Sequence, residues 1–485
     1  MKAFVSIMLC AILTAGIVGC SQKAVQRTVP ITTSSKEALK EYLEGQSISE
    51  KLQATKSLEH FDKAIALDSN FASAYLNRAN NSFSAKDFFS YLEKAKMVSA
   101  QASPGERLNI LAAEAGAYGK LDMQKVYLDS LLTMFPDDER VQFNIGAYYY
   151  GLQDYQRAID HYKKALQVVP EYSPVYNILG YAYRQIEKYD DAEKTFKKYT
   201  ELIPDDPNPY DSYAELLMKR GRFDESIANY QKALVIDSLF VSSRLGIAAN
   251  YIYKGMYEKG TAELETLLKL ARNDGERRAK YFTQAVLYTD AGKMEEALIE
   301  FDKEYKIAEQ NADAAAMSGD VNAKATILLE MGKYQDALAA FEKSAKIIFD
   351  SNLSEKVKDN ADLFLHYDRA QVAIAQKDRK IAIQETEKFR KKAEADNNLN
   401  QTRLAHELAG RFALSEKKGD LAIKELLQAN LQNPYNLYRL ALAYQLSGDK
   451  VKGKAFCSAA SDFNGLPALN YAFIRIKAGK MLSNI

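Results

Sequence analysis

The chain has 485 residues, of which 47% are hydrophobic and 27% charged, and its 65 Lys and Arg nearly balance its 64 Asp and Glu. A single globular core rarely grows beyond about 250–300 residues, so this length predicts several domains or an array of repeats. The even charge balance comes with no basic stripe, which argues against nucleic acid as a partner.

The N-terminal segment, up to Gly19, differs in composition from the rest of the chain. Lys2 is followed by an apolar run from Ala3 to Val18, which is typical of a secretory signal peptide. The sequence Ile17-Val18-Gly19-Cys20 resembles the lipobox, at which bacterial lipoproteins are cleaved before a cysteine that becomes lipidated. This resemblance implies a signal peptide over residues 1–19 and a lipidated N-terminus at Cys20. The alternative is a signal peptide cleaved elsewhere, with Cys20 incidental.

The residues around Cys20 also carry expectations about location. Three acyl chains, as this class of lipoprotein usually carries, exceed the two signals that stable membrane attachment needs. Ser21 follows the cysteine in place of the Asp that favours inner-membrane retention in Gram-negative lipoproteins, and no acidic cluster for surface export follows it. We therefore expect an outer-membrane lipoprotein that faces the periplasm, with a flexible tether over residues 20–36.

A regular repeat dominates the sequence beyond the tether. Prolines stand at equal steps, at Pro136, Pro170 and Pro204, and Ser238 occupies the next step. Between them, small and aromatic residues recur in an order that predicts pairs of amphipathic helices of about a dozen residues, joined by short turns. The best-matched copy contains Tyr176, Leu179, Gly180, Tyr183, Ala192, Phe196 and Pro204.

This pattern is similar to the tetratricopeptide repeat, whose unit of about 34 residues carries an aromatic residue, Leu-Gly, Tyr, Ala, Phe, Ala and Pro; here Tyr199 replaces the third small residue. The resemblance implies an all-α fold, a right-handed α-solenoid of helical hairpins with a C-terminal capping helix. The small side chains of Gly180 and Ala192 allow the two helices of a hairpin to cross closely, with Phe196 beside the crossing. The expected segments are a repeat array over 37–238, with the best-matched repeats at 105–238, divergent repeats over 239–460, and a capping helix within 461–485.

Two regions depart from the period. The step from Ala297 to Ala337 is longer than the regular step between prolines, so either the helices or the loop are longer there. The second copy, around Tyr75 to Ala95, matches the pattern poorly.

Near the C-terminus, Cys457 is the one cysteine left for the mature body, and its place on an apolar helical face predicts a buried, unreactive thiol.

Motifs that resemble enzyme or metal sites are incomplete. Gly448–Ala455 has the spacing of a phosphate-binding loop, but its last residue lacks the hydroxyl group that magnesium needs and no strand is expected before it. In His406–Gly410, a glycine replaces the second histidine of a helical zinc site. Asp205–Asp211 lacks the spacing of a calcium loop and favours helix capping by Asp206. We therefore expect no catalytic residue, no metal and no cofactor.

The resemblance also implies a concave groove, lined by the first helix of each hairpin, that binds a peptide or a helix of a protein partner. The family's groove positions, carried onto the best-matched copies, give seven candidates: Asn144, Tyr150, Asn177, Tyr181, Arg184, Asp211 and Glu215. They depart from the Lys-Asn-Lys-Arg clamp with which some members hold C-terminal carboxylates. The alternative is that these seven are ordinary solvated positions.

These expectations lead to a membrane-tethered adaptor that binds protein or peptide partners in the bacterial cell envelope. The alternative is a helical lipoprotein that binds carbohydrates or small ligands. Such sites favour aromatic platforms, and this chain has 31 Tyr but no Trp. An enzyme is disfavoured because a regular solenoid offers an open groove and not a deep pocket with perturbed acids.

Overall fold

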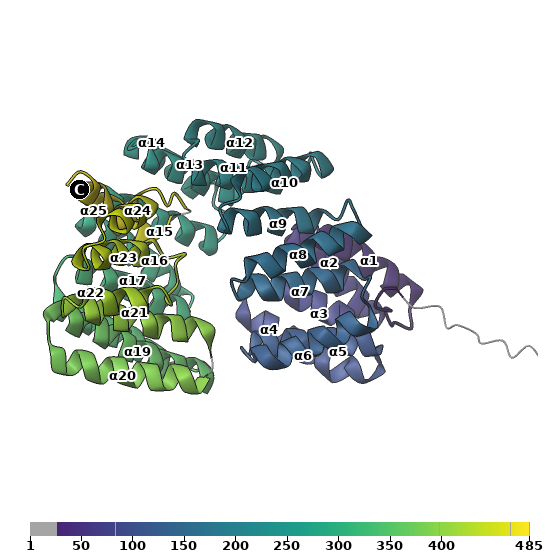
Figure 1. Ribbon diagram of the computed structural model, residues 1–485. Coiled ribbons are helices and arrows are strands. Elements are labelled where there is room, and N and C mark those ends of the chain that lie inside the picture. The colour runs from purple at the N-terminus through teal and green to yellow at the C-terminus, as the bar shows by residue number, and fades with distance from the viewer. Residues whose placement is uncertain (1–26, 83, 397, 466, 485) are drawn as a thin grey trace, which may run out of the picture. The chain divides into compact units, whose positions relative to one another are not determined.

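The computed structural model describes residues 27–82, 84–396, 398–465 and 467–484, and over these ranges the chain forms 25 α-helices and no strand (Figure 1). The expected all-α solenoid is confirmed. The signal peptide and Cys20 lie outside the described residues. The described residues divide into two compact units, one made of residues 27–42 and 60–142 and the other of residues 43–59 and 143–484.

The first part of the chain contains short helices that pair as hairpins. The hairpin of the poorly matched second copy is present, although its first helix is only 9 residues long. The core of the hairpin before it is aromatic, because Tyr42, Phe61 and Phe71 pack together with at most 2% of each residue exposed. The helices are α1 (Lys36–Ser49), α2 (Ala54–Leu67), α3 (Ala72–Asn80), α4 (Ala85–Val98), α5 (Pro104–Ala117), α6 (Leu121–Met134) and α7 (Glu139–Gly151).

A non-helical segment before α1 is bound to this first unit. The backbone amides at positions 29, 32 and 34 donate hydrogen bonds to the carboxylates of Asp138, Glu106 and Asp68, at 2.8, 3.0 and 2.8 Å. All three carboxylates are buried, so these bonds satisfy both the acids and the backbone. The sequence predicted a flexible tether over residues 20–36. From Val29 onward the chain differs from that expectation, because it is hydrogen-bonded to the repeats.

The regular repeats of the second unit have helices of 13 or 14 residues. Gly180 lies where the two helices of one hairpin cross, and a Cβ atom at this position would lie 2.6 Å from the Phe196 ring. Glycine is therefore required by the close approach, as the repeat pattern predicted. These helices are α8 (Tyr155–Val168), α9 (Ser173–Gln185), α10 (Tyr189–Leu202), α11 (Pro207–Lys219), α12 (Phe223–Ile236), α13 (Val241–Tyr253) and α14 (Tyr257–Leu270).

The divergent repeats that follow begin with longer helices, which accounts for the longer step between Ala297 and Ala337. The four helices around that step have 16 or 17 residues each. The helices are α15 (Asp274–Asp290), α16 (Met294–Gln310), α17 (Ala314–Glu330), α18 (Tyr334–Phe349), α19 (Glu355–Gln376), α20 (Arg379–Asp396), α21 (Leu399–Ser415), α22 (Gly419–Leu426), α23 (Pro434–Leu446) and α24 (Lys450–Ser461).

Within the second unit, the first helices of successive hairpins contact one another. Such contacts join α9 to α11, α11 to α13, α13 to α15, α19 to α21, and α21 to α23. The first helices therefore lie on the inner side of the curve of the array, where a groove is expected. Over the described ranges, no helix has both the length and the hydropathy needed to cross a lipid bilayer.

The last helix, α25 (Leu469–Leu482), packs against α24 and α23 at the end of the array. It also packs against α15, which belongs to a hairpin much earlier in the chain, and Figure 1 shows α25 beside both α15 and α24. The helix thus covers the last hairpin, as a capping helix does, and in addition lies against a first helix of the array.

Candidate partner-binding groove

The candidate residues on α9 and α11 are held by two well-defined helices. Asp206 caps α11, because its carboxylate accepts a hydrogen bond from the backbone amide of Asn208 at 2.9 Å, and Pro207 is the first helical residue. This arrangement confirms the predicted capping role of Asp206. The cap fixes where α11 begins, and so fixes which of its side chains face α9.

Asn177 on α9 makes the first link between the two helices. Its side-chain amide donates a hydrogen bond to the side-chain oxygen of Asn208 at 3.3 Å, and its own side-chain oxygen accepts one from the Ser212 hydroxyl at 3.2 Å. Both partners lie on α11, in the next repeat. Asn177 is half-buried, so these bonds satisfy a side chain that is partly removed from water.

Arg184 and Glu215 make the second link. Their charged groups form an ion pair of 3.2 Å between α9 and α11, with 20% and 12% of the two side chains exposed. The guanidinium also lies 4.6 Å from the centre of the Tyr181 ring, a cation–π contact, and that ring meets Phe196 edge-on. The two charges and the aromatic ring therefore form one unit that remains partly open to solvent.

Burial sets the charge states of this unit. Burial of Glu215 raises its pKa above the ordinary value, although Arg184 and Tyr181 act in the opposite direction. Burial of Arg184 works against its charge, but Glu215, followed by Tyr181 and Tyr150, raises its pKa above the ordinary value. Burial, and then Glu215, raises the pKa of Tyr181 well above its usual range. The arginine stays charged in this environment and the tyrosine stays neutral.

Asp211 extends the arrangement to the next repeat. Its side chain is buried, with 5% of the residue exposed, and accepts a hydrogen bond from the Ser243 hydroxyl of α13 at 2.7 Å. Burial, and then the nearby Glu215, raise the pKa of Asp211 to about 7, although Ser243 acts to lower it. We call the five connected candidates the groove network: Asn177, Tyr181, Arg184, Asp211 and Glu215.

Two of the seven predicted residues are not part of the groove network. Asn144 on α7 is exposed. Tyr150, near the end of the same helix, packs edge-on against Tyr155 with ring centres 5.3 Å apart. The five residues of the network are buried or half-buried. The sequence analysis did not identify Ser212 and Ser243, the hydrogen-bond partners of Asn177 and Asp211. Each serine lies on the next first helix, about one repeat after its partner, and this spacing of polar residues could have identified them.

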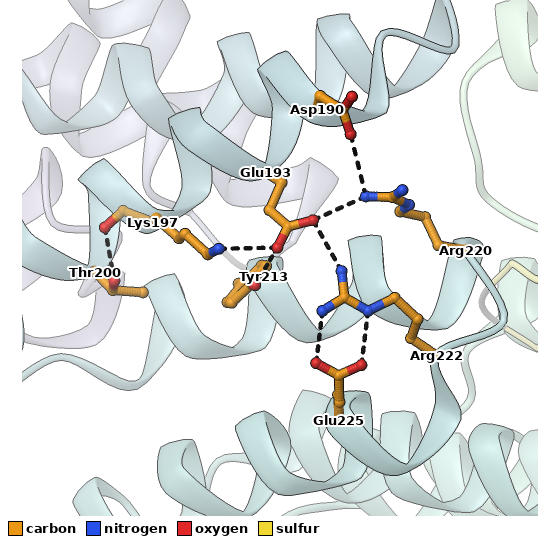
Figure 2. A network of polar contacts seen from close by, with 8 residues as sticks. All are labelled: Asp190, Glu193, Lys197, Thr200, Tyr213, Arg220, Arg222 and Glu225. Carbon is orange, nitrogen blue, oxygen red and sulfur yellow. Dashed lines mark hydrogen bonds and ion pairs between the residues drawn. The ribbon is translucent and has the colours of Figure 1, made fainter.

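A second polar network, which the sequence did not predict, is centred on Glu193 of α10 (Figure 2). Its carboxylate is paired with Lys197, Arg220 and Arg222 at 3.0, 2.8 and 2.9 Å, and it accepts a hydrogen bond from the Tyr213 hydroxyl at 2.8 Å. Burial acts to raise the pKa of Glu193, but hydrogen bonds from Lys197 and Tyr213 and the charge of Arg222 lower it to about 2. This network joins α10 to α11 and to the start of α12.

The histidine of the zinc-like motif and the C-terminal cysteine have structural partners. His406 pairs through Nδ1 with Glu425 at 2.8 Å, and among the described residues no three His, Cys, Asp or Glu side chains are grouped as a metal ion requires. Cys457 is fully buried and donates a weak hydrogen bond to the backbone carbonyl of Ala478 at 3.4 Å. Burial raises the pKa of its thiol, so the prediction of a buried thiol is confirmed.

Comparison with known proteins identifies the repeat. A model of the tetratricopeptide repeat matches residues 137–205, the segment that contains α7 to α10. The chain carries tetratricopeptide repeats. The matched tetratricopeptide repeats include Asn144, Tyr150 and the α9 half of the groove network, and α11 with Asp211 and Glu215 follows directly after them.

Two curated relatives align with about a fifth of the chain. The human protein O-mannosyl-transferase TMTC2 is 30% identical over 98 residues, which are 20% of this chain and 12% of that protein. Small glutamine-rich tetratricopeptide repeat-containing protein 2 of Mycosarcoma maydis is 31% identical over 99 residues, which are 20% of this chain and 28% of that protein. The match thus spans less than a third of either relative.

Among solved structures, a tetratricopeptide repeat protein from Parabacteroides merdae ATCC 43184 is similar to this chain. It is 17% identical, with a TM-score of 0.39, and the match covers 53% of this chain and 96% of that protein.

Proposed function

We propose that this chain is a non-enzymatic scaffold that binds protein or peptide partners through the groove network. The observation that carries this proposal is the connection of five candidate residues on consecutive first helices, α9 and α11, where tetratricopeptide repeats form the inner side of an array. These residues offer a charged pair, an amide and an aromatic ring within one partly exposed surface.

The chemistry of the groove network suits a polypeptide ligand. A peptide brings backbone N–H and C=O groups that can exchange hydrogen bonds with Glu215 and Arg184, whose side chains keep some exposure. The Tyr181 ring adds apolar area at low conformational cost. The preformed contacts between α9 and α11 hold these groups in place before a ligand arrives, which reduces the entropy lost on binding.

The proposal includes attachment to a bacterial membrane through a lipid on Cys20, with the body in the periplasm at the outer membrane. The lipobox-like sequence Ile17-Val18-Gly19-Cys20 supports this part. Eight residues separate Cys20 from Val29, where the hydrogen bonds to the repeats begin, and a stretch of that length spans at most about 30 Å. The repeats would then stay close to the membrane surface and meet partners there.

Affinity capture from envelope membranes tests this function. The full chain is compared with a variant carrying Asn177→Ala, Tyr181→Ala and Arg184→Ala, and with Arg157→Gln, which changes an exposed arginine on the second helix α8. We expect protein partners to be lost from the triple variant and retained by Arg157→Gln, with both variants as helical as the unmodified chain by circular dichroism. Unchanged partners with a folded triple variant would place the binding surface elsewhere. Capture of glycans without proteins would favour the ligand-binding alternative.

A further inference from the structure

The last helix packs against the first helices α15 and α23, and the segment that leads to it contacts the ends of two others. After α24 the chain returns to the repeats of α11 and α13. The Lys219 amine donates a hydrogen bond to the Phe463 carbonyl at 2.5 Å. The Tyr253 hydroxyl donates one to the Gly465 carbonyl, also at 2.5 Å. Lys219 and Tyr253 are the last residues of α11 and α13. The chain therefore crosses two first-helix ends before α25 begins.

The apolar side of α25 is buried in two places. Phe473, with 3% exposed, packs in a cluster with Phe301 and Ile327 from the repeats of α15 to α18. Ile474, fully buried, packs with Leu437 of α23 and Cys457 of α24. Two adjacent residues of one helix thus contact hairpins that lie far apart in the sequence.

Arg475 is bound at the ends of α13 and α15. Its guanidinium donates to both carboxylate oxygens of Asp290, each at 2.8 Å, and to the backbone carbonyls of Tyr253 and Ile252 at 3.1 and 3.2 Å. Asp290 is the last residue of α15 and is buried. Free carbonyls at a helix C-terminus carry partial negative charge, so two helix ends and one carboxylate together hold this cation.

Lys477 is bound at the end of α17. Its amine donates to the Glu330 carboxylate at 2.5 Å and lies 3.2 Å from the Tyr435 hydroxyl, which itself donates to Glu330. Glu330 is the last residue of α17, so the C-terminal ends of α13, α15 and α17 all face cations of α25. The segment Leu469–Leu482 contains three basic residues and no acidic residue, which complements this acidic edge.

We propose that the surface covered by α25 is a binding site for a basic amphipathic helix of a partner protein. In the structure α25 occupies this site and so blocks it. A partner helix with an aromatic–aliphatic pair followed by Arg and Lys, as in Phe473–Lys477, binds there by displacing α25. The occupant must be basic, because removing Arg475 and Lys477 would leave the buried Asp290 and the half-buried Glu330 without the cations that balance their charges, which is costly for carboxylates removed from water. This inference goes beyond the proposed function, since none of these residues belongs to the groove network.

A synthetic peptide of residues 467–484 serves as the basic helix in the first test. Its affinity is measured for the full chain, for Arg475→Glu, and for Lys480→Glu, which makes the same charge change at an exposed position of α25. We expect Arg475→Glu to bind the peptide at least about tenfold more tightly than the other two, because its own helix no longer occupies the site. A peptide that carries Arg475→Glu should bind none of the three. Equal affinity for all three chains, or equal binding of both peptides, would overturn the proposal.

The buried Cys457 thiol gives a second readout that needs no ligand. Because its sulfur touches the backbone of α25, departure of this helix exposes it to a maleimide reagent, and peptide mass spectrometry locates the label. We expect labelling of Cys457 to be at least about tenfold faster in Arg475→Glu than in Lys480→Glu, with the helical content of both chains unchanged. Equal labelling rates in the two folded variants would show that Arg475 does not hold α25 closed, and would overturn the proposal.

Discussion

Asp211 on α11 and Ser243 on α13 are joined by a buried hydrogen bond of 2.7 Å that links two successive repeats. The serine hydroxyl partly stabilises the carboxylate, but burial and the neighbouring Glu215 dominate and raise the pKa of Asp211 to about 7. Asp211 therefore belongs to the groove network and also makes the stability of the array depend on pH.

The first prediction concerns this pH dependence. Between about pH 4 and pH 7 the folded chain keeps a proton on Asp211 that the unfolded chain has lost, so folding stability falls as pH rises through this window. Because asparagine cannot ionise, Asp211→Asn should reduce this loss of folding stability by about 2–4 kcal/mol. Urea unfolding at pH 5 and pH 8 measures it. An equal loss of stability from pH 5 to pH 8 in both chains would contradict the prediction.

The contribution of Glu193 to folding stability should have the opposite dependence on pH. Its pKa of about 2 lies below the unfolded value, so its contribution to stability is present above about pH 4 and is lost as pH falls towards 2. We expect Glu193→Gln to destabilise the chain by about 1–3 kcal/mol at pH 7 and by much less near pH 2.5. The control is Glu201→Gln, which removes an exposed carboxylate paired with Lys198 on the same helix and should change little. A similar effect of both substitutions would argue against the network.

The crossing of α9 and α10 gives a prediction about packing. A Cβ atom at Gly180 would lie 2.6 Å from the Phe196 ring, so Gly180→Ala should destabilise the chain by about 1–3 kcal/mol. Gly319 on α17 has no atom within 4 Å of such a Cβ, and Gly319→Ala should be neutral or stabilising because alanine favours helix. Thermal unfolding of the two variants tests the contrast. If both substitutions stabilise the chain, the close crossing is not a constraint.

The proposed membrane anchor is tested at Cys20. The chain expressed with its leader should be recovered in the membrane fraction, and Cys20→Ala should lose both the lipid, by mass spectrometry of the N-terminal peptide, and the membrane association. Cys457→Ala is the matched control, because that buried thiol lies in the body. Retention of Cys20→Ala in membranes would exclude lipidation as the means of attachment.

The sequence predicted those features that depend on contacts within one repeat or between neighbouring repeats. Gly180, Phe196 and the cap at Asp206 follow from a periodic pattern, because each hairpin must cross and begin in the same way. The grouping of Asn177 with Asp211 was also predictable, since they lie one period apart on successive first helices.

The sequence did not predict the contacts made by the two ends of the described chain. Arg475 and Asp290 are separated by 185 residues, and no periodicity links them. The bonds from Val29 to Asp138 and its neighbours have no sequence signal either, because a backbone amide donor is present at almost every position. The groove network likewise depends on the burial of Arg184 and Glu215, which the spacing of residues does not specify.

Site-specific photo-crosslinking tests the central claim, that partners bind the inner side of the repeats near the groove network. A photoreactive amino acid is placed at Asn144, an exposed residue of the first helix α7 that is predicted to line the groove, and separately at Val235, a position on the second helix α12 with 88% of the residue exposed. We expect a protein or peptide partner to be crosslinked from Asn144 and not from Val235. Crosslinking from Val235 alone, or no protein from either position, would contradict it.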